Sequence, residues 1–225
     1  MATKIIVSYD GTENDLDALA LGRVLSSAGG TLALAYVRHA QEAESGRERL
    51  AEHEAEALLE TGAGILGHPD VPQHVVVSAS TPEGLRGLAV TEHADLIVFG
   101  SAYRTAAGHV DPQASARRLL DGAPFAIALA PAGLADRTDY DVRTIAAISE
   151  SGDPCARETA ETLAARLGAT ISERARSDVD LLVVGSRPGT VTGRVTVSAA
   201  AEYLIELARC PVLVVPRGIT VHFDG

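Results

Sequence analysis

Short apolar runs alternate with stretches of helical periodicity along the first 133 residues. The runs KIIVSYDG, TLALAYV, HVVVSAS, ADLIVFG and APFAIALA have the length and the composition of buried strands. Between them, amphipathic segments predict helices over about 12–27, 41–66 and 81–92, the first after a capping-box-like pair of Thr12 and Asp15. Strands that alternate with helices in this way predict a parallel sheet with helices on both faces.

The chain repeats itself at a constant offset of 85 residues, which places Gly100 on Gly185 and Gly108 on Gly193 without a gap. Residues 94–133 and 179–218 both read as strand, glycine-bearing loop, helix, strand and Pro-x-Gly. Self-similarity of this kind indicates a duplicated structural unit.

The second copy is shorter than the first. Ile145 and Gly185 are 40 residues apart, whereas the equivalent Ile5 and Gly100 are 95 residues apart. Roughly a helix, a strand and most of another helix are missing, although a parallel crossover normally takes a dozen or more residues. Either the second unit has lost one edge of its sheet, or the sequence omits a segment. We expect a complete domain over 1–133, a linker over 134–142, a shortened domain over 143–218 and a tail over 219–225.

The composition narrows the class of protein. Apolar residues make up 46% of the chain, as in a globular protein, and the formal net charge is -11 at pH 7. This charge argues against non-specific binding to nucleic acid or to anionic membranes. No apolar run reaches the ~18 residues of a membrane span, and the N-terminus lacks a signal-peptide pattern, so we expect a cytoplasmic protein. Cys155 and Cys210 lack metal-ligand spacing and are expected to be reduced structural thiols.

The opening IIVSYDGTENDLDALALG, the strand LALAYV, the two repeated blocks and the closing AEYLIELARCPVLVVPRG resemble the universal stress protein family in its tandem two-domain form. The resemblance implies an α/β fold with two domains, each a parallel five-stranded sheet in order 3-2-1-4-5, with the second domain truncated. It also implies that the domains pair through their last strands, FAIALA against VLVV, as a pseudo-dimer. Such pairing would cover an apolar edge that otherwise invites aggregation. Homodimerisation is a further expectation.

Many members of this family bind ATP through a loop of the form G-x2-G-x9-G-[ST], with an aspartate at the end of the first strand. Glycines in such a loop let backbone N–H groups approach phosphate oxygens, and the following helix N-terminus favours negative charge. In the first copy Gly100 matches the opening glycine, but Tyr103 and the pair Gln113-Ala114 replace the later ones. The candidate nucleotide contacts of the first domain are Asp10, Gly11, Thr12, Val37, Gly100, Ser101 and Ser115.

The second copy departs from the pattern in a different way. Gly185 matches, Pro188 replaces the second glycine and removes an N–H donor, and Ser198-Ala199 replaces the closing pair. The strand-one aspartate has three alternative counterparts, Glu150, Ser151 and Asp153. The candidate nucleotide contacts of the second domain are Gly185, Ser186, Arg187, Gly189, Arg194 and Ser198.

These patterns favour a non-catalytic protein of the stress response that binds a small ligand or a partner, with ATP binding weak or lost. An alternative is a regulatory switch that binds ATP or AMP at the first-domain site. A second alternative is a slow nucleotide hydrolase, which fold analogy alone suggests. We expect no metal site, and no nucleophile and base are placed together by the sequence.

Overall fold

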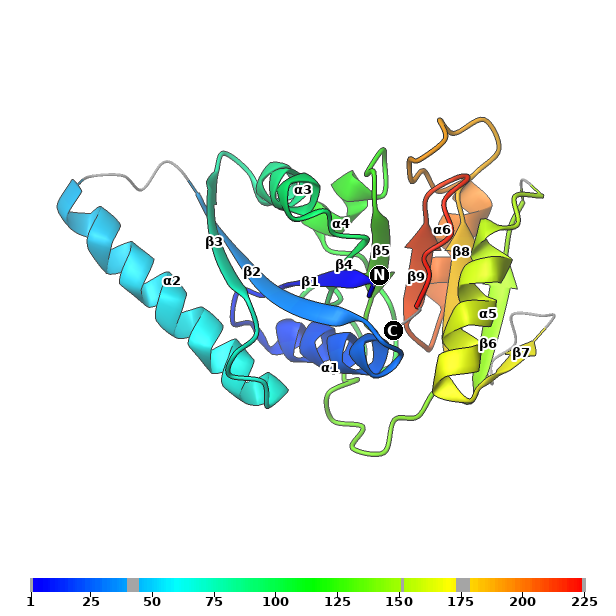
Figure 1. Cartoon of the computed structure of the whole chain (residues 1–225), viewed down its shortest axis with the longest axis horizontal. Coiled ribbons are helices and arrows are strands. Elements are labelled where there is room, and N and C mark those ends of the chain that lie inside the picture. Colours follow the sequence, from blue (N-terminus) through cyan, green and yellow to red (C-terminus); the bar gives the residue numbers. More distant parts are fainter. Residues whose placement is uncertain (1, 40–44, 151, 173–178, 224–225) are drawn as a thin grey trace.

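The computed structural model describes residues 2–39, 45–150, 152–172 and 179–223. The strands of the first half are β1 (Lys4–Ser8), β2 (Thr31–His39), β3 (Gln73–Ser78), β4 (Leu96–Phe99) and β5 (Ala126–Leu129). Those of the second half are β6 (Thr144–Ile148), β7 (Thr170–Ser172), β8 (Leu181–Gly185) and β9 (Val212–Val215). In the described residues these nine strands form one continuous sheet, in the order β3-β2-β1-β4-β5-β9-β8-β6-β7 (Figure 1).

The helices follow the expected periodicity closely. The described residues form α1 (Glu13–Ser27), α2 (Ser45–Leu66), α3 (Thr81–Glu92), α4 (Ala114–Leu119), α5 (Cys155–Leu167) and α6 (Ala199–Leu207). The hydroxyl of Ser80 caps α3 by accepting the N–H of Glu83 at 3.4 Å, and Gly168 ends α5 in the left-handed conformation at φ +68°. The start of the expected helix over 41–66 falls on residues 40–44, which lie outside the described residues.

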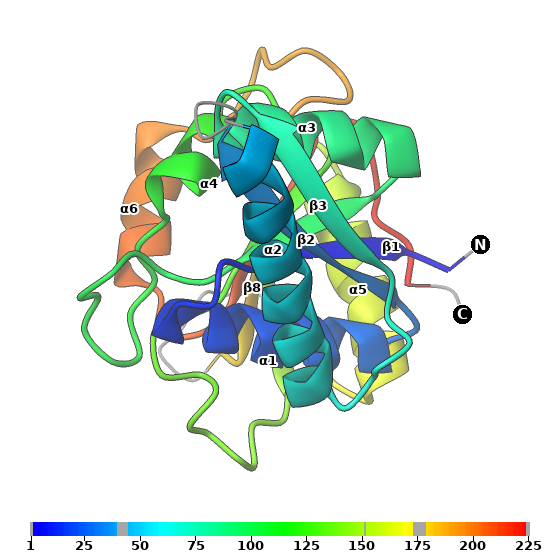
Figure 2. The same cartoon turned by 90° about the vertical axis from the view of Figure 1, so that its left-hand side faces the viewer.

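The first half is the complete parallel sheet that the sequence predicts, in order 3-2-1-4-5. β1 lies between β2 and β4, with Val7 opposite both Leu34 and Val98. α2 packs against β2 and β3 at the outer end of this sheet (Figure 2). The expected fold class is therefore confirmed for residues 4–129.

The two halves join where β5 pairs with β9 in the antiparallel sense. Ile127 lies opposite Val214, Ala128 opposite Leu213, and Leu129 opposite Val212. All these side chains are buried. The pairing of FAIALA with VLVV that the resemblance implies is thus present in the structure, and it merges two sheets into one.

Among its described residues, the second half has no counterpart of the outermost strand β3. Its order, β9-β8-β6-β7, corresponds to 5-4-1-2 of the first half, so the three-residue β7 is the edge of the described sheet. Only residues 173–180 connect β7 to the parallel strand β8, and 173–178 lie outside the described residues. A parallel crossover normally takes a dozen or more residues, so both explanations for the short copy stay predictions.

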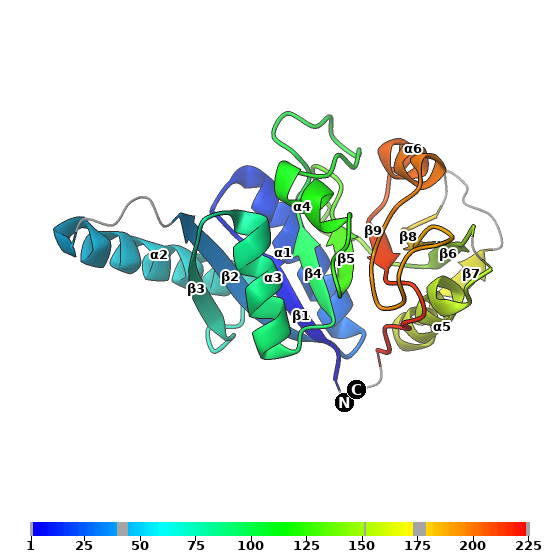
Figure 3. The same ribbon diagram turned by 90° about the horizontal axis from the view of Figure 1, so that it is seen from above.

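Two apolar cores cover the two faces of the sheet, and each runs through both halves. One core lies under α1, α2 and α5, and the other under α3, α4 and α6 (Figures 1 and 3). Leu19 of the first half and Leu163 of the second belong to the first core, while Ile97 and Ile205 belong to the second. Because each core is continuous across the β5–β9 pairing, the halves share their hydrophobic stabilisation.

A carboxylate holds each of the segments that follow β5 and β9. Buried Asp17 of α1 accepts the N–H groups of Gly133 at 2.9 Å and Ala135 at 2.7 Å. Asp153, before α5, accepts the N–H of Gly218 at 2.7 Å, and Gly218 is the repeat partner of Gly133. Burial raises the pKa of Asp17, although its hydrogen bonds oppose that shift. These contacts hold the linker against α1 and the C-terminal segment against the start of α5.

The two ends of the described chain lie side by side (Figures 1 and 3). The hydroxyl of Thr3 donates to the carbonyl of His222, and Val221 donates its N–H to the hydroxyl of Thr159 at 3.0 Å. Phe223 is fully buried in the core of α1 and α5. Among the described residues no helix has both the length and the apolar character of a bilayer span.

Substitution Leu213→Ala tests whether the shared cores unfold together. Leu213 is 1% exposed and pairs with Ala128 across the junction, so we expect a loss of about 2–5 kcal/mol in unfolding free energy by urea titration. Hydrogen exchange should accelerate in β1 as well as in β6. Leu207→Ala, at a site 54% exposed, is the control and should stay within about 0.5 kcal/mol. Faster exchange confined to the second half would contradict a shared core.

Candidate functional site

The expected nucleotide site of the first half lies at the carboxyl ends of β1 and β4. These strands are neighbours, and their following helices, α1 and α4, belong to opposite faces of the sheet. Open α/β sheets bind ligands at such a switch point. Because β1 and β4 are parallel neighbours, the segment from Asp10 to Thr12 and the pair Gly100-Ser101 lie at the same edge of the sheet.

Asp10 forms a carboxyl pair with a residue that the sequence analysis did not assign to the site. The N–H of Asp10 donates to the carboxyl of buried Asp15 at 2.5 Å, and Thr12 donates its N–H to the Asp10 carboxyl at 3.1 Å. Burial, with the adjacent Asp10 carboxyl, raises the pKa of Asp15 to about 8. Through these hydrogen bonds the pair anchors the first turn of α1.

Gly100 is required by close packing. A Cβ atom at this position would lie 2.0 Å from the backbone oxygen of Asn14, in the first turn of α1. The equivalent Gly185 is less crowded, since its Cβ would lie 3.2 Å from the hydroxyl of Ser149. The opening glycine of each loop thus lets a helix start against the end of a strand, most tightly in the first half.

The serine after each opening glycine is buried, and its hydroxyl holds the loop in place through hydrogen bonds. The hydroxyl of Ser101 donates to the carbonyl of Ala130 at 2.7 Å and accepts the N–H of Asp111 at 3.2 Å. The hydroxyl of Ser186 makes the equivalent contacts, at 2.9 Å to the carbonyl of Val215 and 3.2 Å from the N–H of Thr196. Both serines are at most 1% exposed, so their hydroxyls hold the loop to the last strand.

Several backbone N–H groups of each loop donate hydrogen bonds within the protein. A phosphate cradle requires N–H groups that point at the ligand. In the first loop, N–H groups donate within the protein from Ala102, Thr105, Gly108, His109 and Asp111. In the second loop, they donate from Arg187, Thr190, Gly193, Arg194, Val195 and Thr196.

The later glycines of the loops serve turns. Gly108 and Gly193 have φ of +79° and +78°, and each donates its N–H to the segment after the last strand of its half. Gly189 has φ +83°, and the residue equivalent to it, Arg104, adopts φ +67° without being glycine. The two loops therefore share one backbone shape, which explains why glycines recur away from the positions of the ATP-binding pattern.

Strand register decides between the three counterparts of Asp10. Ile5 pairs with Leu96, and Ile145 pairs with Leu181, which is the repeat partner of Leu96. Ile145 is therefore the counterpart of Ile5, and counting five residues onward from each places Glu150 at the position of Asp10. The carboxyl of Glu150 accepts the hydroxyl of Ser198 at 2.7 Å. Glu150 therefore contacts the start of α6 directly.

The remaining candidates do not converge on one place. Val37 is buried in β2 against Gly84 of α3, and Ser115 lies in the first turn of α4. Ser198 caps α6 by accepting the N–H of Ala201 at 3.0 Å. The guanidinium of Arg194 donates to the carbonyl of Gly122 in the first half, at 3.1 Å. As ligand contacts, the candidate residues of both halves stay predictions.

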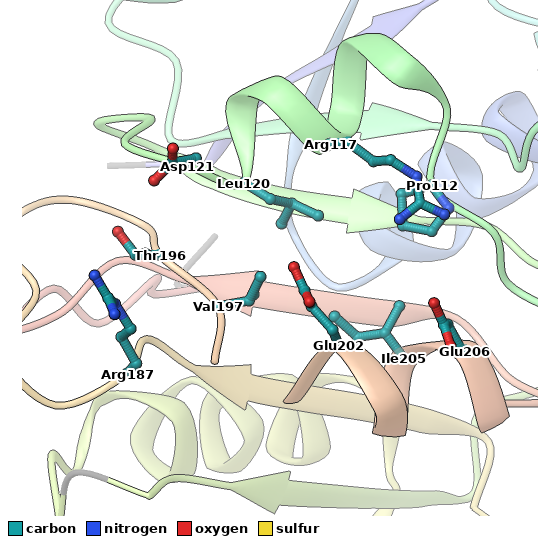
Figure 4. Close-up of a pocket in the computed structure, with 10 residues that line it drawn as sticks. All are labelled: Pro112, Arg117, Leu120, Asp121, Arg187, Thr196, Val197, Glu202, Ile205 and Glu206. Carbon is teal, nitrogen blue, oxygen red and sulfur yellow. The ribbon is translucent and has the colours of Figure 1, made fainter. Parts of the chain in front are cut away.

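Arg187 instead lines a cavity of about 360 Å³ between the two halves (Figure 4). The cavity lies between α4 and α6, and four pairs of its lining residues are repeat partners at the offset of 85. These pairs are Pro112 with Val197, Arg117 with Glu202, Leu120 with Ile205, and Asp121 with Glu206. Sequence reasoning missed the cavity because it exists only where the two repeats meet.

Residues 156–216 match the family model described as the universal stress protein family. The resemblance to this family is confirmed. The matched residues cover α5 to β9, including the loop with Gly185. A search of curated protein sequences finds no match to the chain.

Solved structures show the same fold over nearly the whole chain. A universal stress protein from Archaeoglobus fulgidus DSM 4304 has a TM-score of 0.70 and 15% identity, over 96% of this chain and 98% of that chain. A functionally unknown protein from Pseudomonas aeruginosa PAO1 has a TM-score of 0.59 and 15% identity, over 96% and 93%. A universal stress protein in complex with cAMP matches only 42% of this chain at a TM-score of 0.36, which bears on neither fold nor ligand here. The tandem universal-stress-type fold is confirmed.

Alanine at the two opening glycines tests their packing role. Gly100→Ala places a Cβ atom 2.0 Å from the Asn14 backbone oxygen, so we expect a loss of about 1–3 kcal/mol in unfolding free energy. Gly185→Ala is the matched control, because its nearest contact is 3.2 Å to a hydroxyl, and we expect a change below about 1 kcal/mol. Urea unfolding measures both. Equal effects would show that close packing is not the reason for Gly100.

The raised pKa of Asp15 predicts a pH dependence of stability. The folded protein keeps a proton on Asp15 up to about pH 8, whereas the unfolded chain releases it near the ordinary value of 3.8. Asp15 therefore stabilises the fold fully below pH 3.8, and this contribution is lost as pH rises towards 8. Asp15→Asn should remove that loss, so its urea stability should fall less than the wild type between pH 5 and pH 8. The exposed control Glu54→Gln should follow the wild type; parallel curves for Asp15→Asn would refute the assignment.

Proposed function

We propose that this chain is a non-catalytic universal-stress-type protein that acts in a stress response by binding a small ligand or a partner, with ATP binding weak or lost. The observation that carries this proposal is the commitment of loop N–H groups to hydrogen bonds within the protein, repeated in both halves. A triphosphate that required these N–H groups would have to break those hydrogen bonds.

Charges near the loops support the same proposal. In the first loop, Asp111 places a carboxylate near α4, and Arg117 forms an ion pair with it at 2.5 Å. In the second, Pro188 has no N–H, and Arg194 is hydrogen-bonded to the first half. Arg117 and Arg194 are therefore engaged within the protein, and Arg187 lines the cavity between the halves.

An ATP- or AMP-binding switch is the second candidate function. It is favoured by the exposed carboxylate of Asp10, which lies beside Gly100 at the switch point of the first sheet. No observation favours the slow nucleotide hydrolase. The cytoplasmic location and the homodimer remain predictions.

Calorimetric titration with ATP and magnesium separates the two candidates. We expect no saturable heat up to millimolar ATP, no phosphate release above a blank, and the same result for Asp10→Ala. A titration of a protein of known ATP affinity, in the same buffer, is the control. Saturable heat that Asp10→Ala abolishes would replace our proposal with the nucleotide switch. Native mass spectrometry of the protein as purified tests ligand binding directly, and we expect a bound small molecule or partner rather than ATP.

A further inference from the structure

The cavity between the halves has the size and the lining of a small-molecule site. Its volume of about 360 Å³ falls within the range of ligand pockets. Figure 4 shows side chains from α4 and its flanking segments facing those from α6 and the loop before it. The apolar part of the lining comes from Leu120, Val197, Ile205 and Pro112. Leu120 and Ile205 are buried, so the apolar floor is held by the second core.

The charged part of the lining is predominantly acidic. Asp121, Glu202 and Glu206 contribute carboxylates, whereas Arg187 and Arg117 contribute cations. Arg117 is held by Asp111, which lies outside the lining. Among the described residues, the carboxylates of Asp121, Glu202 and Glu206 form no ion pair or hydrogen bond of their own. With Arg117 paired to Asp111, three carboxylates share the cavity with one remaining cation, Arg187, so the lining has an excess of negative charge.

Glu202 and Glu206 concentrate that charge on one helix. They are four residues apart on α6, where like charges are neighbours and destabilise the helix. Both side chains face the cavity, beside Ile205 (Figure 4). A cation bound between them would relieve this repulsion, while a hydrocarbon group attached to it would contact the apolar floor.

We infer that the cavity binds a small organic cation, with its ammonium or guanidinium group at Glu202 and Glu206 and its hydrocarbon body over Leu120, Val197 and Ile205. This inference rests on the proposed function, because it names the class of small ligand. An anion such as ATP would meet an excess of carboxylates over cations, so the charge of the cavity disfavours nucleotides. The site differs from the strand ends at Asp10, since every lining residue lies at the junction of the repeats.

Titration with hexan-1-amine and hexan-1-ol, followed by backbone amide NMR of the full chain at pH 7, tests this inference. The two probes share a hydrocarbon chain and differ in the charge of one end. We expect the amine to shift amides in 117–121 and 196–206, and to bind about five- to tenfold more tightly than the alcohol. Ammonium chloride at the same concentration controls for charge without a hydrocarbon body and should not saturate.

The double variant Glu202→Gln/Glu206→Gln should reduce amine affinity to that of the alcohol. The matched control is Glu56→Gln/Glu60→Gln, which removes the same charge at the same spacing from exposed positions on α2 and should leave amine binding unchanged. An equal loss of amine affinity in both double variants would show that only the net charge of the protein matters, and it would overturn the inferred site. Saturable shifts at Asp10 and Gly100 instead would overturn the cavity but leave a small-ligand function standing. If neither probe binds, the inference fails, and the mass spectrum of the purified protein decides the proposed function separately.

Discussion

The antiparallel pairing of β5 with β9 is the interaction on which the rest of this molecule depends. Each half ends in an apolar four-residue strand that would be an unpaired edge if the half stood alone. Pairing these strands covers both edges and aligns the two sheets. It also lets each apolar core continue from one half into the other. The truncated second half, with its three-residue outer strand, can therefore rely on the first half for much of its buried surface.

The repeated loops show how a motif can be retained for its shape. Ser101 and Ser186 make the same set of hydrogen bonds, and the turns at Gly108 and Gly193 have nearly the same φ. The shared contacts bind each loop to the segment that follows the last strand of its half. The Gly-Ser pair of each loop therefore has a packing and hydrogen-bonding role that requires no phosphate.

Much of the fold could be predicted from the sequence, because apolar periodicity and self-similarity report directly on strands, helices and duplication. The candidate site was harder to predict from the sequence. The sequence indicated Asp15 only as part of a helix start, because its burial beside Asp10 depends on how α1 packs. The equivalence of Glu150 with Asp10 required strand register, which letters alone left open among three residues. The cavity required both helices α4 and α6 to be placed in space, so no local pattern could reveal it.

Because the two halves belong to one chain, the two sides of their interface need not have the same sequence, as they must in a symmetric homodimer. In a symmetric homodimer every residue near the two-fold axis faces a copy of itself, so a charge there meets the same charge. Here the repeat partners Arg117 and Glu202 carry opposite charges on the two sides of the junction. A single-domain ancestor could not acquire such an asymmetric pair by one substitution, because the change would appear on both sides. The covalent linker thus gives this protein an interface whose two sides can specialise independently.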